Sequence, residues 1–552
     1  MSIPRETDVF IVGCGPCGLM MANEFGRRGV AATLVDTKST TAFNPQANAT
    51  QARSMEHYRR HGFADEIRAM GMPPDYPPDI AYFTRISKYE LARFSLPTAK
   101  DAKEIIKGLS GAWSAAELPH RVSQKYVEQV LLKHARKYPT NEIHFETRFV
   151  GFTDFGTHVD CVTEPLNGGP QTITRAKFIV GADGGRSLVR KQMGVSYAGE
   201  SGRQREFMGG RMYAIYLKCP SYYAQMPNSP AWMNVTVNAE QRAFMTAIDG
   251  KEEFSFHFQL KPGQDEDLID EAEAKRQVFT GWGKELPIEI LSRVSWTAGY
   301  TLVAERMRQG NAFIGGDAAH LFTPAGGMGY NTAIEDAVNL AWKLSAVLQG
   351  YGGESLLQSY DTERRAVAVR NTGYARAFAD SLGNFVAVPE LEQATPKGEE
   401  ARHIAGEYYN KHARAEFNIP GFTLGARYDG CEIIASDGTK PPPDGPNIYH
   451  PTACPGGRAP HMWFADGTSL YDKFGFDWTL LQMGETTDGI DNLVSAAKAA
   501  GMPLQITTIK DKNLRDLYEA DLALIRPDQV VAWRGTTGNT EAEALIAKIS
   551  GK

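Results

Sequence analysis

Three glycines with a chemically informative spacing stand near the start of the sequence. Gly13, Gly15 and Gly18 form the pattern G-x-G-x-x-G, after an apolar run at residues 8–13 and before a stretch of helical composition. Glycines at this spacing allow a tight turn and a close approach of the backbone to a pyrophosphate at a helix N-terminus. Asp36 ends the next apolar run, where a carboxylate can hold a ribose hydroxyl. Together these residues predict the binding of a dinucleotide.

Two cysteines within this turn allow a second interpretation. Cys14 and Cys17 form a C-x-x-C pattern, which is typical of dithiol redox centres with reactive thiolates. A dithiol centre requires neither the flanking Gly13 and Gly18 nor an acid after the next strand. The pattern therefore favours cysteines that pack beside a cofactor, with dithiol chemistry as the alternative.

Two further pairs of Gly and Asp follow strand-like runs later in the sequence. Asp183 precedes Gly184 after residues 177–182, and Gly316 precedes Asp317 after residues 312–315. An Asp at such a position is often a turn or helix cap rather than a ligand. The second pair leads into the glycine-rich segment 324–331 and then a helix, where successive backbone N–H groups can bind an anion or a polarised ring. We interpret both pairs as candidate cofactor contacts.

A common set of strands and helices has to position these residues. Residues 8–13 and 31–36 are expected to be buried strands joined by a helix over residues 19–28. A crossover of this length gives parallel pairing, so the sequence predicts a doubly wound α/β domain. Between residues 205 and 300, aromatic and β-branched residues alternate with polar ones, which indicates an inserted antiparallel β domain.

The second half of the sequence is predicted to be helical and then to form a small α/β unit. Helices are expected over residues 333–350 and 355–382, and the Pro-rich residues 440–446 suggest a boundary. Strands at 476–481, 504–508 and 530–533 alternate with helices at 491–500 and 540–549. We expect three units: a discontinuous cofactor domain (1–75, 100–200 and 295–385), a β domain (76–99 and 201–294) and a helical linker with a C-terminal domain (386–552).

Composition argues against several classes of function. The chain has 552 residues, a formal net charge of −6 and six cysteines, so it lacks the excess of basic residues typical of nucleic-acid binding and the cysteine density of a disulfide scaffold. We expect no membrane span, because no run of about 18 apolar residues occurs. Acidic residues interrupt residues 1–8 and no secretory apolar core follows, which favours a reducing cytoplasm. No cluster of His and Cys has metal-ligand spacing, so no metal is expected.

The order of these motifs resembles that of a known family. They are the glycine pattern with Asp36, residues 181–184, residues 315–320 and the segment 324–331, with Gln124 and residues 336–343 as further matches. The sequence resembles class A flavin-dependent aromatic hydroxylases of the p-hydroxybenzoate hydroxylase and phenol 2-monooxygenase type, over residues 5–385. Residues 424–428 and 456–461 resemble the thioredoxin-like C-terminal domain of the phenol hydroxylase subgroup, here without a C-x-x-C pattern.

The resemblance implies a fold and a cofactor. The fold would be a Rossmann-like FAD-binding α/β domain of the glutathione-reductase type, an inserted, mostly antiparallel β domain for the substrate, and a thioredoxin-like α/β domain at the C-terminus. FAD would be bound, and NAD(P)H, with NADPH slightly preferred, would be the co-substrate. The residues that the resemblance assigns to cofactor binding are Gly13, Gly15, Pro16, Cys17, Gly18, Asp36, Thr37, Gln46, Arg53, Gln124, Asp183, Gly184, Arg190, Gly316, Asp317, Pro324, Gly327, Met328, Gly329, Tyr330 and Asn331.

The resemblance also implies a reaction. NAD(P)H would reduce the flavin, O₂ would add at C4a, and the resulting hydroperoxide would transfer its distal oxygen to an activated carbon of a phenolic ring. Activation requires a base of near-neutral pKa or a hydrogen-bond relay to one. The candidates are His257, where phenol hydroxylase has a tyrosine, together with Asn48, Tyr213 and Tyr300. Asn48 replaces an Asp of many relatives, and a neutral amide orients a phenol without deprotonating it.

Two other functions share these sequence features. One is an FAD-dependent reductase or dehydrogenase that does not insert oxygen productively, and the other is a flavoprotein scaffold without enzymatic activity. We favour the monooxygenase, because an inserted β domain beside a flavin supplies a wall for an aromatic substrate. The expected partners are a small phenolic substrate, as in phenol degradation, and O₂. A homodimer formed through the C-terminal domain is also considered.

Overall fold

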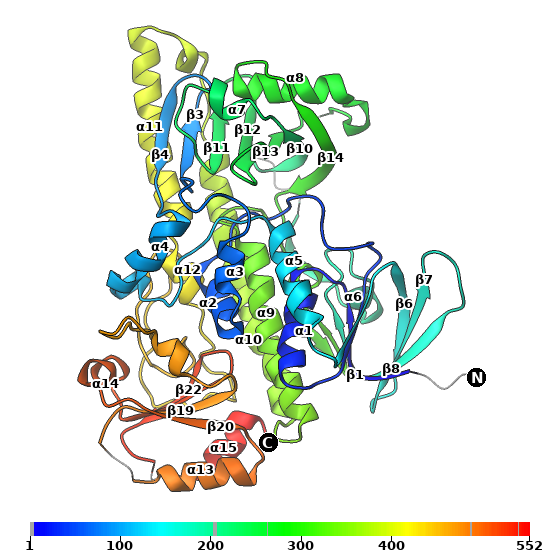
Figure 1. Ribbon diagram of the computed structural model, residues 1–552, viewed down its shortest axis with the longest axis vertical. Helices are drawn as coiled ribbons and strands as arrows, with labels where there is room; N and C mark the ends of the chain where they lie inside the picture. The colour runs from blue at the N-terminus through cyan, green and yellow to red at the C-terminus, as the bar shows by residue number, and fades with distance from the viewer. Residues whose placement is uncertain (1–4, 202–206, 262, 486–487, 539) are drawn as a thin grey trace.

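The computed structural model describes residues 5–201, 207–261, 263–485, 488–538 and 540–552. Three groups of elements follow one another along its long axis: a sheet with flanking helices at one end, a helical middle with a second sheet at its side, and a smaller sheet at the other end (Figure 1). The sequence analysis expects no secretory leader in residues 1–8. Of these, residues 1–4 lie outside the described residues.

An eight-stranded sheet forms the framework of the predicted cofactor domain. It contains β1 (Arg5–Val12), β2 (Ala32–Val35), β5 (Asn141–His144), β6 (Thr147–Asp154), β7 (Val159–Pro165), β8 (Thr172–Gly181), β16 (Arg308–Gln309) and β17 (Ala312–Ile314). Strand β1 pairs in parallel with β2 and β8, and β17 pairs in parallel with β8. The carboxyl ends of β1, β8 and β17 therefore meet at one edge of the sheet, which brings the three predicted motifs together. The prediction of a doubly wound α/β domain is confirmed.

Helix α1 (Pro16–Arg27) directly follows the glycine turn. Gly15 is its N-cap and Pro16 stands at its first position, where a missing backbone N–H costs nothing. All residues from Cys17 to Gly26 are buried, so the helix lies inside the domain. It packs against α5 (Gln124–Ala135) and α9 (Met328–Leu348). This packing fixes the direction of the helix N-terminus toward the turn.

A seven-stranded sheet forms the second unit, and it is antiparallel except for one pair. Its order is β14 (Glu289–Ala298), β10 (Gly210–Lys218), β13 (Glu253–Gln259), β12 (Arg242–Ala247), β11 (Met233–Val237), β3 (Ile80–Phe83) and β4 (Glu90–Phe94), with β11 and β3 parallel. Directly opposed residues of antiparallel strands share one face. Phe256 lies on the face toward α8 (Glu271–Trp282), because a Cβ on Gly281 would come within 2.7 Å of its ring. Ser255 and His257 therefore lie on the opposite face.

Three long helices connect the units. The sequence predicted α9 and α10 (Glu354–Gly383), and α9 begins earlier than expected, at Met328. Helix α11 (Pro396–Phe417) was assigned to the C-terminal part, but it packs on β4 of the seven-stranded sheet (Figure 1). The rings of Tyr82 on β3 and Tyr409 on α11 stack with their centroids 4.7 Å apart. The helix therefore covers the sheet face that is opposite to α8.

The C-terminal unit has a four-stranded sheet in the order β20 (Leu504–Thr508), β19 (Trp478–Gln482), β21 (Leu522–Ile525) and β22 (Val531–Gly535). Strands β19 and β20 are parallel, whereas β21 is antiparallel to both of its neighbours. With α13 (Ile490–Ala499), α14 (Lys512–Tyr518) and α15 (Ala542–Ser550), this topology confirms the thioredoxin-like prediction. Sequence analysis missed β21 because its four apolar residues show no alternation.

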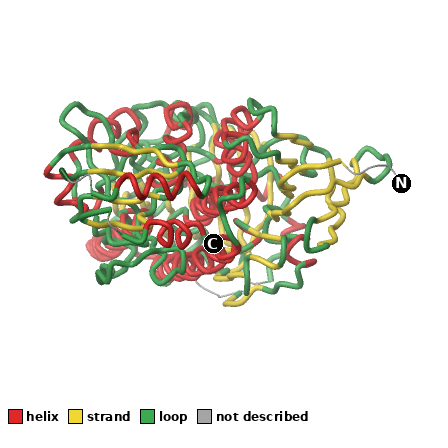
Figure 2. The backbone as a smooth tube through the Cα atoms, turned by 90° about the horizontal axis from the view of Figure 1, so that it is seen from below, coloured by secondary structure: helices red, strands yellow, loops and turns green. Residues whose placement is uncertain are grey.

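Several shorter elements complete the fold. They include α2 (Ala52–His61), α3 (Ala64–Arg68), α4 (Ala99–Ile105), α6 (Leu188–Gln192), α7 (Tyr222–Gln225), α12 (Pro420–Leu424), η4 (Gly316–Ala318) and a sheet of β9 (Tyr197–Glu200), β15 (Thr301–Ala304) and β18 (His320–Phe322). Seen from below, the strand-rich N-terminal part lies at one side and the helices fill the middle (Figure 2). Within the described ranges, no helix has the length and apolar character needed to cross a membrane.

Candidate active site

The glycine turn has the tight geometry that its sequence predicts. Gly13 adopts φ +112°, and a Cβ there would lie 2.2 Å from the carbonyl oxygen of Ala182, after β8. A Cβ on Gly18 would lie 2.0 Å from the carbonyl oxygen of Gly13. By contrast, a Cβ on Gly15 would meet no atom within 4 Å. The outer glycines thus allow close packing of the chain, whereas Gly15 leaves open space in front of the helix N-terminus.

Asp36 lies beside this turn. Its Oδ2 accepts a hydrogen bond from the backbone N–H of Cys14 at 2.8 Å, and its Oδ1 accepts one from Lys38 N–H at 2.9 Å. The carboxylate is half-buried, while the neighbouring Thr37 is exposed. A carboxylate fixed in this way retains lone pairs for a further donor such as a ribose hydroxyl.

The two cysteines of the turn are buried thiols. Both Cys14 and Cys17 are free, and desolvation raises the pKa of each above its ordinary value. Nearby carboxylates, Asp36 for Cys14 and Asp336 for Cys17, raise these pKa values further. Because the thiolate is the reactive form, this environment argues against the dithiol alternative. Cys17 instead fills space next to Gly315 and Gly316.

The Asp183 motif forms a capped turn. Asp183 Oδ2 accepts hydrogen bonds from the N–H groups of Leu188 at 2.7 Å and Val189 at 3.3 Å, at the start of α6, while its Oδ1 is buried without a hydrogen-bond partner among the described residues. Desolvation raises the pKa of this carboxyl above its ordinary value. Gly184 allows the turn with φ +78°. Oδ2 thus caps the turn, as an Asp after a strand often does. Oδ1 remains available to a ligand.

Arg190 connects two loops at the edge of the eight-stranded sheet. It is buried, and its Nη1 donates to the Tyr197 hydroxyl at 2.7 Å, the Gly185 carbonyl at 3.2 Å and the Ala318 carbonyl at 3.3 Å. Its guanidinium also lies 3.9 Å from the centroid of the Tyr197 ring. These contacts join the loop after β8 to η4. All of these acceptors bind Nη1, so the predicted contact of Arg190 with the flavin and NAD(P)H stays a prediction.

A buried chain of charged groups supports the loop that carries Asp317. Asp336 Oδ2 accepts from Gly316 N–H at 3.1 Å and lies 2.6 Å from His320 Nε2, and its Oδ1 accepts from Arg364 Nε at 2.7 Å. Gly316 itself adopts φ +61°. Asp317 is exposed at this loop, yet enough protein surrounds it that desolvation raises its carboxyl pKa above the ordinary value. His320 and Asp336 thus position the motif rather than contact a ligand.

Residues of segment 324–331 are tied to the segment before α2. Asn331 Oδ1 accepts from Gln51 N–H at 2.8 Å and from Ser54 Oγ at 2.7 Å, and Gln51 Nε2 donates to the Gly326 carbonyl at 2.8 Å. A Cβ on Gly327 would lie 2.9 Å from the Cβ of Ala49. We call residues 324–331 the cradle loop. Its predicted members Pro324, Met328 and Gly329 are exposed, buried and half-buried, respectively.

Sequence analysis missed two residues that fix this loop. Gln51 bonds to it as described, and Glu416 at the end of α11 accepts from Gly326 N–H at 2.8 Å. Tyr330 is a predicted cofactor contact. Its hydroxyl forms a hydrogen bond with the hydroxyl of Tyr58 on α2, and this bond connects the cradle loop to α2. No sequence pattern identifies Glu416, because α11 reaches the loop only through the tertiary fold.

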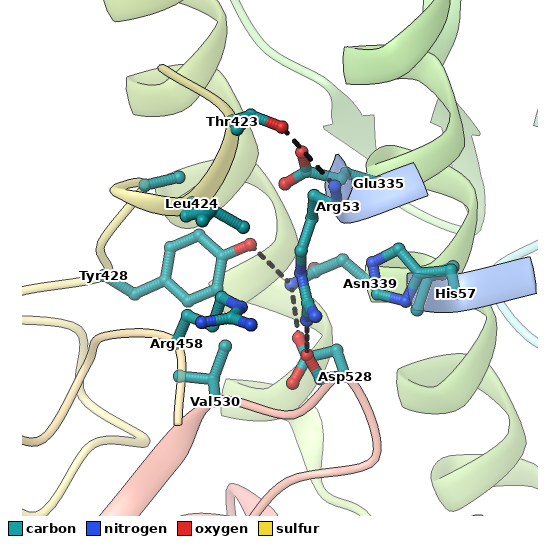
Figure 3. A pocket seen from close by; sticks show the side chains of 12 residues that line it. Arg53, His57, Glu335, Asn339, Thr423, Leu424, Tyr428, Arg458, Asp528 and Val530 are labelled. Atoms are coloured by element: carbon teal, nitrogen blue, oxygen red, sulfur yellow. Dashed lines mark hydrogen bonds between the residues drawn. The ribbon is translucent and has the colours of Figure 1, made fainter. Parts of the chain in front are cut away.

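Arg53 and Gln124 stand in the first turns of α2 and α5, respectively. Gln124 N–H donates to the Ala47 carbonyl at 2.6 Å. Arg53 is directed away from the glycine turn: its Nη1 donates to Gln529 Oε1 at 2.7 Å and its Nη2 to the Asp528 carbonyl, in a small polar pocket between α2, α9 and the C-terminal unit (Figure 3). Arg53 Nη1 also donates to Glu56 Oε2 at 2.9 Å, and the predicted contact of Arg53 with the cofactor stays a prediction.

The candidate substrate residues do not share one surface. Tyr213 pairs with Phe258 and therefore lies on the α8 face of the seven-stranded sheet, whereas His257 lies on the other face. Ala325 and Met328 of the cradle loop pack in the same apolar core as the residues of this sheet. Strand alternation directs the Tyr213 side chain to the face opposite to α11, and its role as a substrate contact stays a prediction. Tyr300 is half-buried near the cradle loop, its carbonyl accepting from Thr323 Oγ1 at 3.0 Å.

Comparison with family models decides which family this arrangement represents. A model described as "FAD binding domain" matches residues 6–375, and one described as "aromatic-ring hydroxylase, C-terminal" matches residues 452–552. The first match spans all three motifs at the edge of the eight-stranded sheet. The chain belongs to the FAD-dependent aromatic-ring hydroxylases. These matches confirm the family resemblance that the sequence showed.

Individual relatives of this hydroxylase agree with that assignment. The aklavinone 12-hydroxylase of Streptomyces peucetius is 30% identical, with 87% of this chain and 92% of the relative aligned. The phenol 2-monooxygenase of a Pseudomonas species is 28% identical over 99% of this chain and 93% of the relative. The solved structure of a rebeccamycin biosynthetic enzyme with reduced flavin matches with a TM-score of 0.88 and 30% identity, over the full length of both chains.

The residues around the cradle loop fit FAD. Three buried side-chain atoms near the predicted contacts have no hydrogen-bond partner among the described residues: Asn48 Oδ1, Ser123 Oγ and Asp183 Oδ1. The segments of Asn48 and Ser123 run side by side, because Thr50 forms a β-bridge with His120. Buried polar atoms are normally hydrogen-bonded, and the hydroxyls and ring N–H groups of FAD would supply the missing partners. With the open space at Gly15, these atoms support FAD in the hydroxylase.

Proposed function

We propose that the protein hydroxylates a phenolic ring with FAD, O₂ and NAD(P)H, with NADPH as the preferred reductant. The observation that carries the proposal is the face of the seven-stranded sheet that α11 covers, because Glu416 at the end of α11 also holds the cradle loop. On this face His257 stacks on Phe244, with ring centroids 4.5 Å apart, and contacts the ring of Trp296. An aromatic wall with one polar edge beside the flavin loop suits a flat, hydroxylated substrate. The residues 76–99 and 201–294 are proposed to form this substrate unit.

The chain's own residues would bind and orient, while FAD supplies the activation and transfer of oxygen when it is bound. The N-terminus of α1 and Asp36 would hold the nucleotide part of the cofactor. The cradle loop, fixed by Asn331 and Glu416, would orient its ring. The sheet and α11 would exclude water from the space beside the ring. The phenol 2-monooxygenase and aklavinone 12-hydroxylase among the relatives support an aromatic substrate with hydroxyl groups.

His257 differs from the near-neutral base that the sequence suggested. Its Nδ1 accepts a hydrogen bond from Trp296 Nε1 at 3.3 Å, so the ring proton resides on Nε2, which lies 2.8 Å from Ser255 Oγ. Burial lowers the pKa of His257 to about 3. The imidazole is therefore neutral at physiological pH and is a poor proton acceptor. We propose that it positions the substrate wall instead.

This assignment predicts the pH dependence of a His257→Gln variant. We expect its kcat to fall about tenfold through lost positioning, while the pH profile of kcat between pH 6 and 9 keeps its shape. The unfolded chain takes up the His257 proton below its ordinary pKa of 6.5, whereas the native state does so only at about 3. Native stability therefore falls as the pH drops from 6.5 toward 3, and the variant should lose less of it. Steady-state kinetics and urea unfolding at pH 7 and 5 measure both effects.

The exposed His403 on α11 provides the matched control. His403→Gln should leave kcat unchanged. Loss of one limb of the kcat profile in His257→Gln, with His403→Gln unchanged, would show that His257 titrates during turnover and would refute the positioning role.

A panel of phenols assayed under ¹⁸O₂ tests the proposed function. For each compound, NAD(P)H oxidation and the hydroxylated product are measured together, with NADH and NADPH compared. A substrate should accelerate NAD(P)H oxidation and carry one ¹⁸O atom into its product. NAD(P)H oxidation without labelled product across the panel would favour the reductase or dehydrogenase alternative, and absence of substrate-stimulated oxidation would favour a scaffold.

The proposal also includes the oligomeric state and the cellular location of the protein. A homodimer through the C-terminal unit and a cytoplasmic location follow the sequence expectation. The six cysteines, all free, agree with a reducing compartment. Light scattering and fractionation of the native host would test the two features separately.

A further inference from the structure

The turn at residues 526–530, between β21 and β22, joins the C-terminal unit to the cofactor domain. Gln529 in this turn has φ +59°, a left-handed conformation that is costly for a residue with a side chain. Its Oε1 accepts a hydrogen bond from Arg53 Nη1 on α2 at 2.7 Å. Asp528 Oδ2 accepts one from Asn339 Nδ2 on α9 at 3.1 Å (Figure 3). The turn therefore holds a strained residue where it contacts two helices of the cofactor domain.

Tyr428 extends this contact toward the cofactor motifs. Its ring packs in the apolar core of the C-terminal unit with Leu524 and Val530, and the residue is 8% exposed. Its hydroxyl accepts a hydrogen bond from Arg364 Nη1 on α10 at 3.0 Å, and Asn339 Nδ2 donates to it at 3.5 Å (Figure 3). Tyr428 thus offers Arg364 an acceptor that belongs to the C-terminal unit.

Arg364 connects Tyr428 to the loop after β17. Its Nε donates to Asp336 Oδ1 at 2.7 Å, and Asp336 Oδ2 accepts from Gly316 N–H at 3.1 Å. Both Arg364 and Asp336 are fully buried. Burial alone would raise the pKa of Asp336, but the charges of His320 and Arg364 lower it to about 2, so the carboxylate is ionised. A chain of charge-assisted hydrogen bonds therefore leads from a hydroxyl of the C-terminal unit to the backbone of a cofactor motif.

Removal of the Tyr428 hydroxyl would disturb this chain. Among the described residues, Arg364 Nη1 would retain only Glu335 Oε2, at 3.4 Å. A buried guanidinium that loses an acceptor carries a cost in free energy, so we expect it to move toward the remaining carboxylate. Glu335 and Tyr428 both line the pocket of Figure 3, which leaves room for this movement. Asp336 and the loop that it holds would then lose their fixed position.

We propose that the C-terminal unit takes part in FAD binding and that Tyr428 is its positioning residue, which acts on the loop of Gly316 through Arg364. Gly316 and Asp317 are predicted cofactor contacts, so the position of their loop should set the affinity for FAD. This role requires no C-x-x-C pattern in the unit. It concerns binding of the cofactor alone, so a failure of this proposal and a failure of the proposed hydroxylation can be told apart.

Titration of FAD into the Tyr428→Phe apoprotein tests the proposal. Phenylalanine keeps the packing of the ring and removes only the hydroxyl. We expect the dissociation constant of FAD to rise about tenfold relative to the native protein. Tyr518→Phe is the matched control, because Tyr518 is fully buried in the same unit and its hydroxyl donates to the Pro460 carbonyl at 3.0 Å, within that unit. This control should lose stability and keep the native affinity for FAD.

Urea unfolding of both variants, measured without FAD, separates positioning from a general loss of stability. The proposal requires a loss of FAD affinity in Tyr428→Phe that Tyr518→Phe does not share at a similar loss of stability. If Tyr428→Phe binds FAD as tightly as the native protein, or if both variants lose affinity equally, the proposal is overturned and Tyr428 is a packing residue.

Hydrogen exchange of the native protein with and without FAD provides a test that needs no substitution. Because coupling between two sites is reciprocal, FAD should slow exchange of the amides at residues 526–530 at least about fivefold. Exchange in α13, which packs on α15 and β20 of the same unit, should slow less. Unchanged exchange at residues 526–530, or equal slowing in both segments, would contradict a specific link between the C-terminal unit and the FAD site.

Discussion

Replacing Gly15 with alanine is expected to lower the affinity for FAD about a hundredfold without weakening the apoprotein. Gly15 has φ −83° and ψ −172°, which alanine adopts readily, and a Cβ there meets no protein atom within 4 Å. The new methyl group would instead occupy the space that a pyrophosphate needs at the N-terminus of α1. Titration of the apoprotein with FAD, followed by flavin fluorescence, measures the loss.

Two comparisons make this result specific. Gly373→Ala, at an exposed position of α10 with no atom within 4 Å of the added Cβ, should leave FAD affinity unchanged. Gly18→Ala should destabilise the apoprotein itself, because its Cβ would lie 2.0 Å from the Gly13 carbonyl oxygen. Unchanged FAD affinity in Gly15→Ala would show that the pyrophosphate does not pass this turn.

Replacing Glu363 with alanine is expected to destabilise the fold by about 3–5 kcal/mol, because it leaves the buried Lys343 without its counter-charge and leaves Arg526 with Asp528 alone as an acidic partner. Glu363 on α10 lies 2.6 Å from Lys343 Nζ on α9 and 2.6 Å from Arg526 Nη1 of the C-terminal unit. The side chains of all three residues are 0% exposed. Thermal and urea unfolding of the variant measure the loss.

The cluster of Glu363, Lys343 and Arg526 links the C-terminal unit to α9, so its loss should also affect the cofactor site. Helix α9 begins in the cradle loop and carries Lys343 further along, so we expect Glu363→Ala also to lower the FAD content of the purified protein. Glu407→Ala, at an exposed position of α11, should change stability by no more than about 0.5 kcal/mol. Equal unfolding midpoints for the two variants would show that the cluster does not join the C-terminal unit to the FAD domain.

Sequence reasoning was most successful where function depends on a local pattern. Gly13, Gly15 and Gly18 with Asp36 lie as their spacing predicted, because a strand, a tight turn and a helix are neighbours in the chain. The later motifs at Asp183 and Asp317 were placed at the same sheet edge for a similar reason: parallel strands bring their carboxyl ends together.

Side-chain direction in the β domain could not be obtained in this way. Tyr213 and His257 both lie in strands that the sequence predicted, yet they occupy opposite faces of the sheet. A shift of one residue in register reverses every side chain of a strand, so the identity of a strand alone does not decide which residues meet a ligand. Burial likewise turned His257 from a candidate base into a neutral group.

The sequence by itself determined the FAD-binding framework and the family of this hydroxylase, because these depend on residues close together in the chain. Only the tertiary structure decided that Arg53 binds the C-terminal unit, that Glu416 holds the cradle loop, and that Arg121 Nη1 is buried without a hydrogen-bond partner among the described residues. Each of these facts depends on contacts between segments that are far apart in the sequence. Burial and pairing of a charge are properties of such contacts, and no local pattern of residues encodes them.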